Sequence, residues 1–470
     1  PTWVSGDTAN SAGSRTEKMD HSGIWLPNYH IQLHLPYLIF IFALGGVVGS
    51  FLNVVILRLP RGENIISPPS HCPNCGHRLR WFENLPIVGY LFVKGRCTSC
   101  GRRISLQYPL IELLCAVMFG GIFVLYYMIT PGGPTFVNHL APPWLPESGF
   151  TETWPILILH LLMLAGLLGM TIIDLRTFQI PILIPTFISV LAVPIHALMP
   201  ILPGSWLRMP LEEPGLSAWI IPLASPAALG ACLLGLVGIF ISTMLLRRAD
   251  LRPAYHDFDL WVGPEDPITA YPYARREIEW ELDFLGPVVI GLMLGALIGG
   301  GLARMGGGEA ADLPLWASAM GGSLFGWFAG FGIVWAIRLL GTVGFGKEAM
   351  GLGDAYLLAA VGAVLGWVDV VLIFFIAPFF GIAGFIVQQI VASIARGRSD
   401  GSRDGAETAT SGPDNASGDA SASELTELPW WEAPLPYGPW LALATVVVMF
   451  GDHWIAGFLS VLMQSPIHLP

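Results

Sequence analysis

Charged residues are scarce in this chain. Asp, Glu, Lys and Arg make up 12% of its 470 residues, whereas hydrophobic residues make up 53%. Because soluble domains carry about a quarter charged residues, this composition indicates a polytopic membrane protein. The first 36 residues also lack the basic and then apolar pattern of a cleavable signal peptide, so none is expected there. The formal net charge of −11 says little about nucleic acid, since the basic residues gather on particular loops, and no nucleic-acid partner is expected.

Ten apolar runs predict about ten transmembrane helices in a lipid bilayer. The run at 355–367 is short and could continue further along the chain. Lys and Arg concentrate in alternate loops between the runs, and the loop at 130–154 has none. The positive-inside rule therefore puts the basic loops in the cytoplasm and the N-terminus outside. The runs are 36–59, 109–129, 155–173, 181–202, 225–246, 287–305, 315–340, 355–367, 368–395 and 437–463.

The runs and loops divide the chain into eight segments. The linker among them is rich in Gly, Ser, Ala, Asp and Thr over 396–427, and its few apolar residues predict disorder. The segments are a polar N-terminal segment (1–36), a first transmembrane helix (37–59), a cytoplasmic four-cysteine zinc-binding domain (60–108), helices carrying Asp174 (109–224), an extra helix pair with a cytoplasmic acidic loop (225–314), helices carrying Asp354 (315–395), the linker (396–436) and a C-terminal helix (437–470).

Four of the six cysteines form two CxxC pairs in a basic loop. A glycine follows each pair, and the pairs are Cys72 with Cys75 and Cys97 with Cys100. Each pair can form a tight knuckle that offers two thiolates, and four thiolates complete a tetrahedral zinc site. Disulfides are the less favoured alternative in a reducing cytoplasm. Four thiolates leave no open position, so the zinc would be structural. The other two cysteines lie in apolar runs and are interpreted as core: Cys115 and Cys232.

Two aspartates lie where apolar runs meet predicted cytoplasmic loops. Asp354 follows Gly351 and Gly353 at the start of one run, and Asp174 ends another. A carboxylate in a membrane segment is costly, so it is a functional hypothesis by default. The glycines remove side chains and would let another backbone, such as a substrate's, come close. The alternatives are that Asp354 only caps its helix, and that Asp174 is an interfacial charge beside Arg176.

The predicted topology puts Asp174 and Asp354 on the same side of the membrane. Two close carboxylates share a proton because both cannot ionise cheaply. One could then act as a general base on water and the other as a general acid toward a substrate carbonyl. Two further polar residues have two interpretations each. Asn53 either bonds to a neighbouring helix or faces a site, and Glu112 is either a first-turn carboxylate favoured by the helix dipole or part of a site.

Taken together, these motifs resemble the type IV prepilin leader peptidase/N-methyltransferase family, whose members are intramembrane aspartyl proteases of the GxGD type. GxGD alone is a weak signal, but it is strong when joined in this order to the cysteine domain and Asp174. The resemblance covers about 37–195 and 316–395. The stretches that carry it are GSFLNVV at 49–55, RLP at 58–60, NLP at 84–86, the cysteine pairs, IP at 180–181 and MGLGD at 350–354.

The resemblance implies a fold, a function and a location. The fold would be an all-α polytopic membrane protein with a small cytoplasmic zinc-ribbon-like domain. Members of the family cut the short basic leader from prepilins and pseudopilins, and many N-methylate the new N-terminus with S-adenosylmethionine. Asp174 and Asp354 would be catalytic, and Gly351 and Gly353 would contact the substrate. The location would be the bacterial cytoplasmic (inner) membrane, with the active site facing the cytoplasm.

Two positions depart from the family's pattern. Tyr356 stands where the family usually has lysine, and Ile182 stands where it usually has Asn or Asp. A missing lysine could change the protonation of the aspartate pair or the seating of the substrate. The extra helix pair and the linker also fall outside the family's usual plan. They keep open a catalytically weakened or silent scaffold that binds pilin-like helices. A small-solute transporter is a weaker third hypothesis, since it predicts charges near the bilayer midplane.

Overall fold

Helices build nearly all of the secondary structure. The structure is a computed structural model, and it describes residues 28–129, 136, 140, 150–201, 222–255, 257, 272–305, 313–400 and 436–463. Across those residues there are two isolated bridges and no strand. The predicted disorder of the linker falls on residues outside the described part, except that 396–400 are helical. The all-helical fold predicted from the sequence is confirmed for the described residues.

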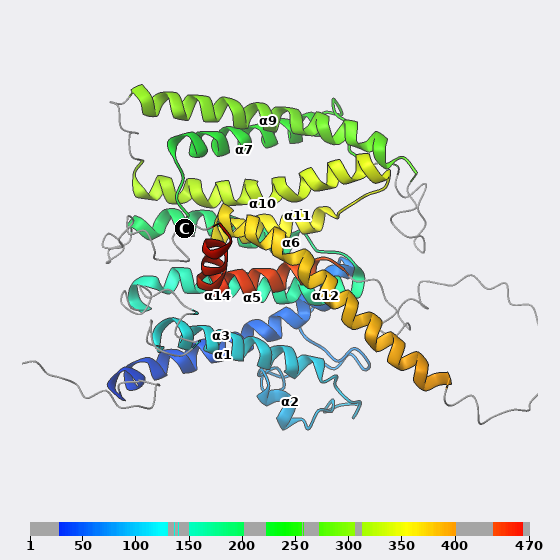
Figure 1. Cartoon of the computed structure of the whole chain (residues 1–470). Coiled ribbons are helices and arrows are strands. Elements are labelled where there is room, and N and C mark those ends of the chain that lie inside the picture. The colour runs from blue at the N-terminus through cyan, green and yellow to red at the C-terminus, as the bar shows by residue number, and fades with distance from the viewer. Residues whose placement is uncertain are drawn as a thin grey trace, which may run out of the picture.

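Ten apolar helices correspond to the ten predicted runs. Eight are long and apolar enough to cross a membrane, and two have shorter apolar segments. Figure 1 shows most of them running side by side, with the four-cysteine domain around the short helix α2 (Val88–Phe92) at one edge. The ten are α1 (Asn28–Arg58), α3 (Gln107–Tyr127), α5 (Phe150–Thr177), α6 (Leu183–Leu198), α7 (Pro226–Arg247), α9 (Ala274–Met305), α10 (Leu315–Phe345), α11 (Leu352–Leu365), α12 (Trp367–Asp400) and α14 (Gly438–Met463). Two 3-10 turns, η1 (Leu59–Arg61) and η3 (Met199–Ile201), follow α1 and α6.

Several helices extend beyond the predicted apolar runs. α1 begins at Asn28, α9 begins at Ala274, and α12 continues to Asp400. The first turns of α9 are charged, so a hydropathy window does not include them. Their Glu277 and Glu281 are nevertheless buried. These residues are four apart and therefore lie on one face of the helix, where the protein interior covers them.

α11 is short and almost completely enclosed. Gly366 has a φ of 99° and separates α11 from α12, so the apolar run ends at Leu365. Every residue from Leu357 to Leu365 is buried, as is Ala355. A helix that is apolar on all sides belongs in the interior, and α11 is accordingly surrounded by other helices.

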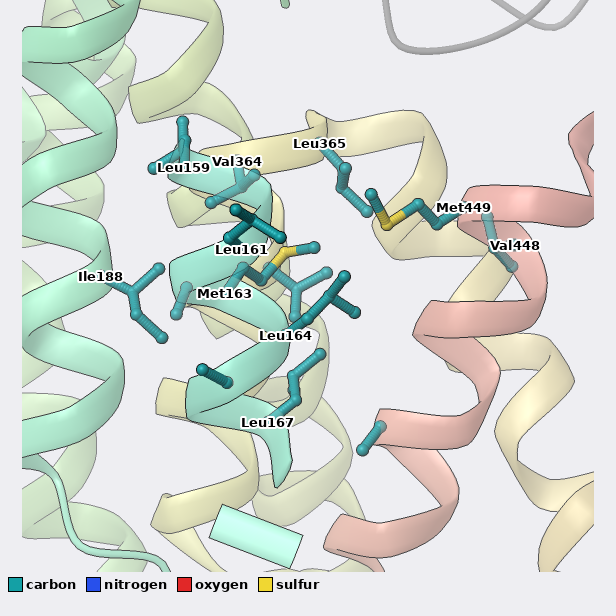
Figure 2. Packing of buried hydrophobic residues seen from close by; sticks show 14 of the residues in the cluster. Leu159, Leu161, Met163, Leu164, Leu167, Ile188, Val364, Leu365, Val448 and Met449 are labelled. Atoms are coloured by element: carbon teal, nitrogen blue, oxygen red, sulfur yellow. The ribbon is translucent and has the colours of Figure 1, made fainter. Parts of the chain in front are cut away.

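α5 lies at the centre of the largest apolar core. In Figure 2 its buried side chains lie between those of α6, α11 and α14. Association of helices in a bilayer relies on close van der Waals packing, because lipid tails are as apolar as the side chains. This packing places the end of α5 near the starts of α11 and α14. The labelled residues are Leu159, Leu161, Met163, Leu164, Leu167, Ile188, Val364, Leu365, Val448 and Met449.

The predicted extra helix pair consists of α7 and α9. Glycines let the two backbones come close: Gly295 of α9 lies against the carbonyl group of Gly230 in α7. Ser242 of α7 also donates a hydrogen bond of 2.6 Å to the carbonyl oxygen of Phe284 in α9. Gly235 of α7 lies beside Phe328 of α10, so the pair packs on the helix that leads to Asp354.

Candidate functional site

A cavity of about 470 Å³ lies where α5 ends and α11 begins. It brings together both predicted catalytic aspartates and both predicted substrate-binding glycines. The last residues before α14 complete its wall. The lining residues are Asp174, Phe178, Gln179, Ile180, Glu348, Ala349, Met350, Gly351, Gly353, Asp354, Pro436 and Tyr437.

Asp174 lies in the last turn of α5 and is 5% exposed. The backbone N–H of Gly438 donates a hydrogen bond of 3.1 Å to its Oδ2 atom. Arg176, by contrast, donates to the side chain of Gln107 in α3 at 2.6 Å. No ion pair between Asp174 and Arg176 occurs in the described structure, which weakens the alternative of an interfacial charge pair.

The turn after Asp174 is strained. Phe178 has a φ of 53°, and its N–H donates to the carbonyl oxygen of Asp174 at 2.9 Å. A left-handed conformation costs a bulky residue on the order of 1–3 kcal/mol. The turn leads the chain to Ile180, which lies against α11. A Cβ atom added at Gly353 would lie 2.8 Å from the Cβ of Ile180, so glycine is required there for close packing.

Asp354 is the third residue of α11, whose N-cap is Gly351. The interpretation of Asp354 as the N-cap residue is therefore wrong. Its carboxylate lies in the first helical turn, where a negative charge is favoured by the helix dipole. A Cβ added at Gly351 would meet the Oδ2 atom of Asp354 at an ordinary 3.6 Å. Gly351 thus lines the cavity, but an added Cβ atom would fit at its position, whereas close packing requires glycine at position 353.

The start of α14 is a part of the site that no sequence motif indicates. Pro436 and Tyr437 line the cavity, and Gly438 binds Asp174 through its N–H. The available signal was the Gly-Pro pair at 438–439, which is typical of a helix start. No residue near that pair indicates that Gly438 contacts Asp174, because the two residues are brought together only by the packing of α14 on α5.

Neither departure from the family's pattern lines the cavity. The ring of Tyr356 lies edge-on to that of Phe331 in α10, with a centroid distance of 5.1 Å. Ile182 is 51% exposed at the start of α6. Both side chains therefore occupy positions outside the lining of the aspartate cavity.

The four predicted metal ligands form one cluster. Their Sγ atoms all lie within 4.8 Å of one another. Cys72 and Cys100 are 3.9 Å apart, as are Cys75 and Cys97. A tetrahedron with Zn–S bonds of about 2.3 Å separates its sulfurs by about 3.8 Å, whereas a disulfide requires about 2 Å. The cysteines are free thiols in this geometry and fit a tetrahedral metal ion.

Two matching knuckles present these thiols. Gly76 and Gly101 each have a φ of 70°, and their N–H groups donate to the carbonyl oxygens of Cys72 and Cys97 at 2.9 Å. The glycines thus adopt the left-handed conformation that the turns require. The backbone N–H of Arg102 lowers the pKa of Cys100 to about 6, which favours its thiolate form. Desolvation and the neighbouring Cys100 raise the pKa of Cys75 to about 11.

The four-cysteine domain is attached to the membrane helices through Glu112 of α3. Glu112 is buried and accepts a 2.7 Å hydrogen bond from the N–H of Ile87, whose φ is 62°. Because α3 begins at Gln107, Glu112 is not in its first turn, and the helix-dipole interpretation is wrong. Asn53 donates to the carbonyl oxygen of Tyr108 at 3.0 Å, which confirms its bond to a neighbouring helix.

A second cavity, of about 630 Å³, lies between the four-cysteine domain and the ends of α1 and α3. Asn53 and Glu112 both line it, together with Arg58 and Arg103. The Oδ1 atom of Asn53 is buried and has no hydrogen-bond partner in the described structure. The second interpretation of Asn53, that it faces a site, is therefore compatible with its bond to α3. The buried Cys115 and Cys232 are core residues, as predicted.

The fold and these sites define a class: a polytopic helical membrane protein with a four-cysteine domain and a pair of aspartates in one cavity. Residues 43–126 match the family model of the bacterial peptidase A24 N-terminal domain. That match covers the second half of α1, the four-cysteine domain and nearly all of α3. It therefore includes the possible metal site but neither aspartate.

Curated relatives extend the comparison. The chain is 48% identical over 101 residues to the prepilin leader peptidase/N-methyltransferase of Myxococcus xanthus (strain DK1622), covering 22% of this chain and 29% of the relative. It is 42% identical over 116 residues to the protein of that name from Klebsiella pneumoniae, covering 23% and 49%. A longer match, 26% identical over 359 residues, covers 71% of this chain and 75% of the Aeromonas hydrophila protein of that name.

These matches confirm the resemblance to prepilin leader peptidases/N-methyltransferases that the motifs predicted. The chain spans between about a third and a half of the length of the first two relatives. No solved structure matches the chain.

Gly438→Ala tests the contact between α14 and Asp174. A Cβ atom there would lie 2.5 Å from Oδ2 of Asp174, so the carboxylate or the helix start must move. We expect the rate of any reaction that depends on Asp174 to fall about tenfold or more. Displacing a catalytic group by 1 Å can lower a reaction rate about a hundredfold. The matched control is Gly457→Ala in the same helix, where an added Cβ meets nothing within 4 Å. Equal activity in the two variants would contradict the role of this contact.

Proposed function

We propose that this protein is a prepilin-type leader peptidase of the bacterial cytoplasmic (inner) membrane, with its active site facing the cytoplasm. One observation carries the proposal: Asp174 and Asp354, on helices far apart in the sequence, line the same cavity. The names of the curated relatives support it. The four-cysteine domain and both aspartates occur in the order that the sequence resemblance requires.

In the proposed mechanism the two carboxylates share one proton. The ionised one takes a proton from a water molecule, which attacks the scissile carbonyl, and the protonated one donates toward the carbonyl oxygen. The N–H of Gly438 holds one oxygen of Asp174 at 3.1 Å. This bond fixes the orientation of the carboxylate, so less reorganisation is needed when the water attacks.

The charge of the cavity favours a basic substrate. Three carboxylates line it: Asp174, Glu348 and Asp354. Among its described lining residues there is no Lys or Arg. A negative cavity attracts a positively charged segment and repels an acidic one. We therefore propose that the basic leader of a prepilin or pseudopilin is the segment that enters here.

We propose a second activity, N-methylation of the new N-terminus with S-adenosylmethionine as the donor. The supporting observation is the cavity of about 630 Å³ beside the four-cysteine domain, a size typical of small-molecule sites. Its acidic Glu112 and basic Arg58 and Arg103 offer partners for the charged groups of an amino-acid-containing cofactor. When bound, the donor would supply an electrophilic methyl group. The chain's own residues would hold it and exclude water.

We further propose that the four-cysteine cluster holds structural zinc. Four thiolates at near-tetrahedral spacing satisfy Zn²⁺ and leave no position for a substrate. Neighbouring side chains stabilise the arrangement. Asn74 donates to the sulfur of Cys100 at 3.7 Å and accepts from Arg102 at 2.6 Å.

Replacing either aspartate tests the peptidase. Wild type, Asp174→Asn and Asp354→Asn would be co-expressed in membranes with a pilin-like substrate, and the leader followed by mass spectrometry. Asparagine cannot exchange the proton, so we expect cleavage to fall by about a hundredfold to ten-thousandfold in each variant. Asp250→Asn, an exposed carboxylate after α7, is the control and should cleave normally. In the same assay, a methyl on the cleaved product that requires S-adenosylmethionine would support the second activity.

Two results would count against the peptidase. Cleavage that survives both asparagine variants would exclude the aspartate mechanism. If the wild type leaves several plausible leaders intact but still co-purifies with the uncleaved substrate, the scaffold alternative becomes the better account, and the departures at Tyr356 and Ile182 become its first explanation.

Elemental analysis tests the metal. We expect about one zinc per purified chain, and its loss in Cys100→Ser, because three thiolates and a hydroxyl bind zinc more weakly than four thiolates. Cys232→Ala, a buried cysteine outside the cluster, should keep the metal. Metal content that is equal in both variants, or absent from the wild type, would contradict a four-thiolate zinc site.

A further inference from the structure

A buried ionic cluster lies between the extra helix pair and the aspartate cavity. Its centre is Arg338 of α10, which is 3% exposed. On one side is Glu281 of α9, which is 8% exposed. On the other is the loop at 346–351, which leads into α11. The proposed mechanism uses none of these charges.

The contacts of Arg338 join the two sides. Its Nη2 and Nε atoms donate to Oε1 of Glu281 at 3.0 and 3.3 Å. Its Nη1 atom donates to the carbonyl oxygen of Met350 at 2.8 Å and pairs with Glu348. The indole N–H of Trp335 donates to the second oxygen of Glu281 at 2.8 Å. Both oxygens of Glu281 and three nitrogens of Arg338 are therefore engaged.

The loop end of this cluster is part of the cavity wall. Glu348 and Met350 both line the cavity. Met350 directly precedes Gly351, the N-cap of the helix whose first turn carries Asp354. The planar guanidinium group presents its donors in a fixed fork. Met350 lies four residues before Asp354. Arg338 thus fixes the position of the Met350 carbonyl group relative to Glu281.

The segment after α7 adds to the same cluster. The guanidinium carbon of Arg338 lies 5.3 Å from the centre of the Tyr255 ring, a cation–π distance. The N–H of Tyr255 donates at 2.7 Å to Glu277, which is fully buried in the first turn of α9. α9 therefore contributes Glu281 and Glu277, and the segment after α7 contributes Tyr255, to a buried network that ends at the cavity.

We propose that Arg338 and Glu281 are positioning residues for Asp354, and that the α7–α9 pair is a structural support for the loop at 346–351. A buried charge that loses its partner is strongly unfavourable, so the loop should hold one conformation only while Glu281 is in place. The catalytic meaning of this proposal rests on the proposed peptidase function, whereas the coupling of α9 to the loop does not.

The test compares three substitutions in the full-length protein in detergent or nanodiscs. Glu281→Gln removes the charge at nearly the same size, and Arg338→Lys keeps the charge but loses the fork. Glu279→Gln removes an exposed charge from the same helix and is the matched control. Hydrogen exchange of the peptide that covers 346–354 reports the loop directly. Cleavage kinetics report its effect on the site.

We expect exchange in this loop to be roughly tenfold faster in Glu281→Gln and Arg338→Lys than in wild type, in the range found for residues that couple sites. The control should exchange like the wild type. In the cleavage assay kcat should fall by a larger factor than KM rises, because Asp354 is displaced whereas the Asp174 side of the cavity wall stays in place. Loss of stability alone would lower the amount of folded enzyme without loop-specific exchange.

The proposal would be overturned if the hydrogen-exchange rate of the loop in both variants equals the rate in the Glu279→Gln control. Arg338→Lys is the milder change, so it keeps the test decisive if Glu281→Gln does not fold. If the wild type cleaves no leader, the peptidase proposal fails, and loop exchange alone then decides whether α9 positions the loop.

Discussion

The enclosure of α11 is the constraint on which the candidate site depends. Its 14 residues span about 21 Å at 1.5 Å per residue, which is less than the hydrocarbon thickness of about 30 Å. A helix so short cannot cross a bilayer alone, and its buried stretch from Leu357 to Leu365 holds it inside the bundle. Its first turn is only partly covered and lies at the end of α5 and the start of α14. Asp354 therefore lines the same cavity as Asp174, whose carboxylate accepts the N–H of Gly438 from a third helix.

The four-cysteine domain depends on a second, separate set of contacts. Its cysteines form their own cluster, while the buried Glu112 holds the strained turn at Ile87 against α3. The carboxylate satisfies a backbone N–H that a turn at the membrane surface would otherwise leave without a partner. The second cavity is a consequence of this arrangement, since it is the space left between the knuckles and the ends of α1 and α3.

Local patterns predicted much of this architecture, and long-range contacts could not be predicted. The spacing of Cys72, Cys75, Cys97 and Cys100 was sufficient because a knuckle is built within a few residues. Apolar length similarly predicted the spans. The charged start of α9 has no apolar pattern that would predict a membrane helix, because its buried glutamates are covered through polar contacts with Arg338 and Tyr255. The roles of Gly438 and Arg338 arise only from tertiary packing, so no neighbouring residue in the sequence could indicate them.

The arrangement of charge also bears on the missing lysine. Tyr356, which stands where the resemblance predicts lysine, packs on Phe331 instead of lining the cavity. The described wall of the cavity then holds three carboxylates and no cation, and such a group of like charges is unfavourable without compensation. Arg338 offsets part of that charge, since it binds Glu348 from behind the wall and Glu281 on its other side. One arginine shared between two glutamates leaves a net negative charge beside the loop, which is the sign that favours a basic substrate.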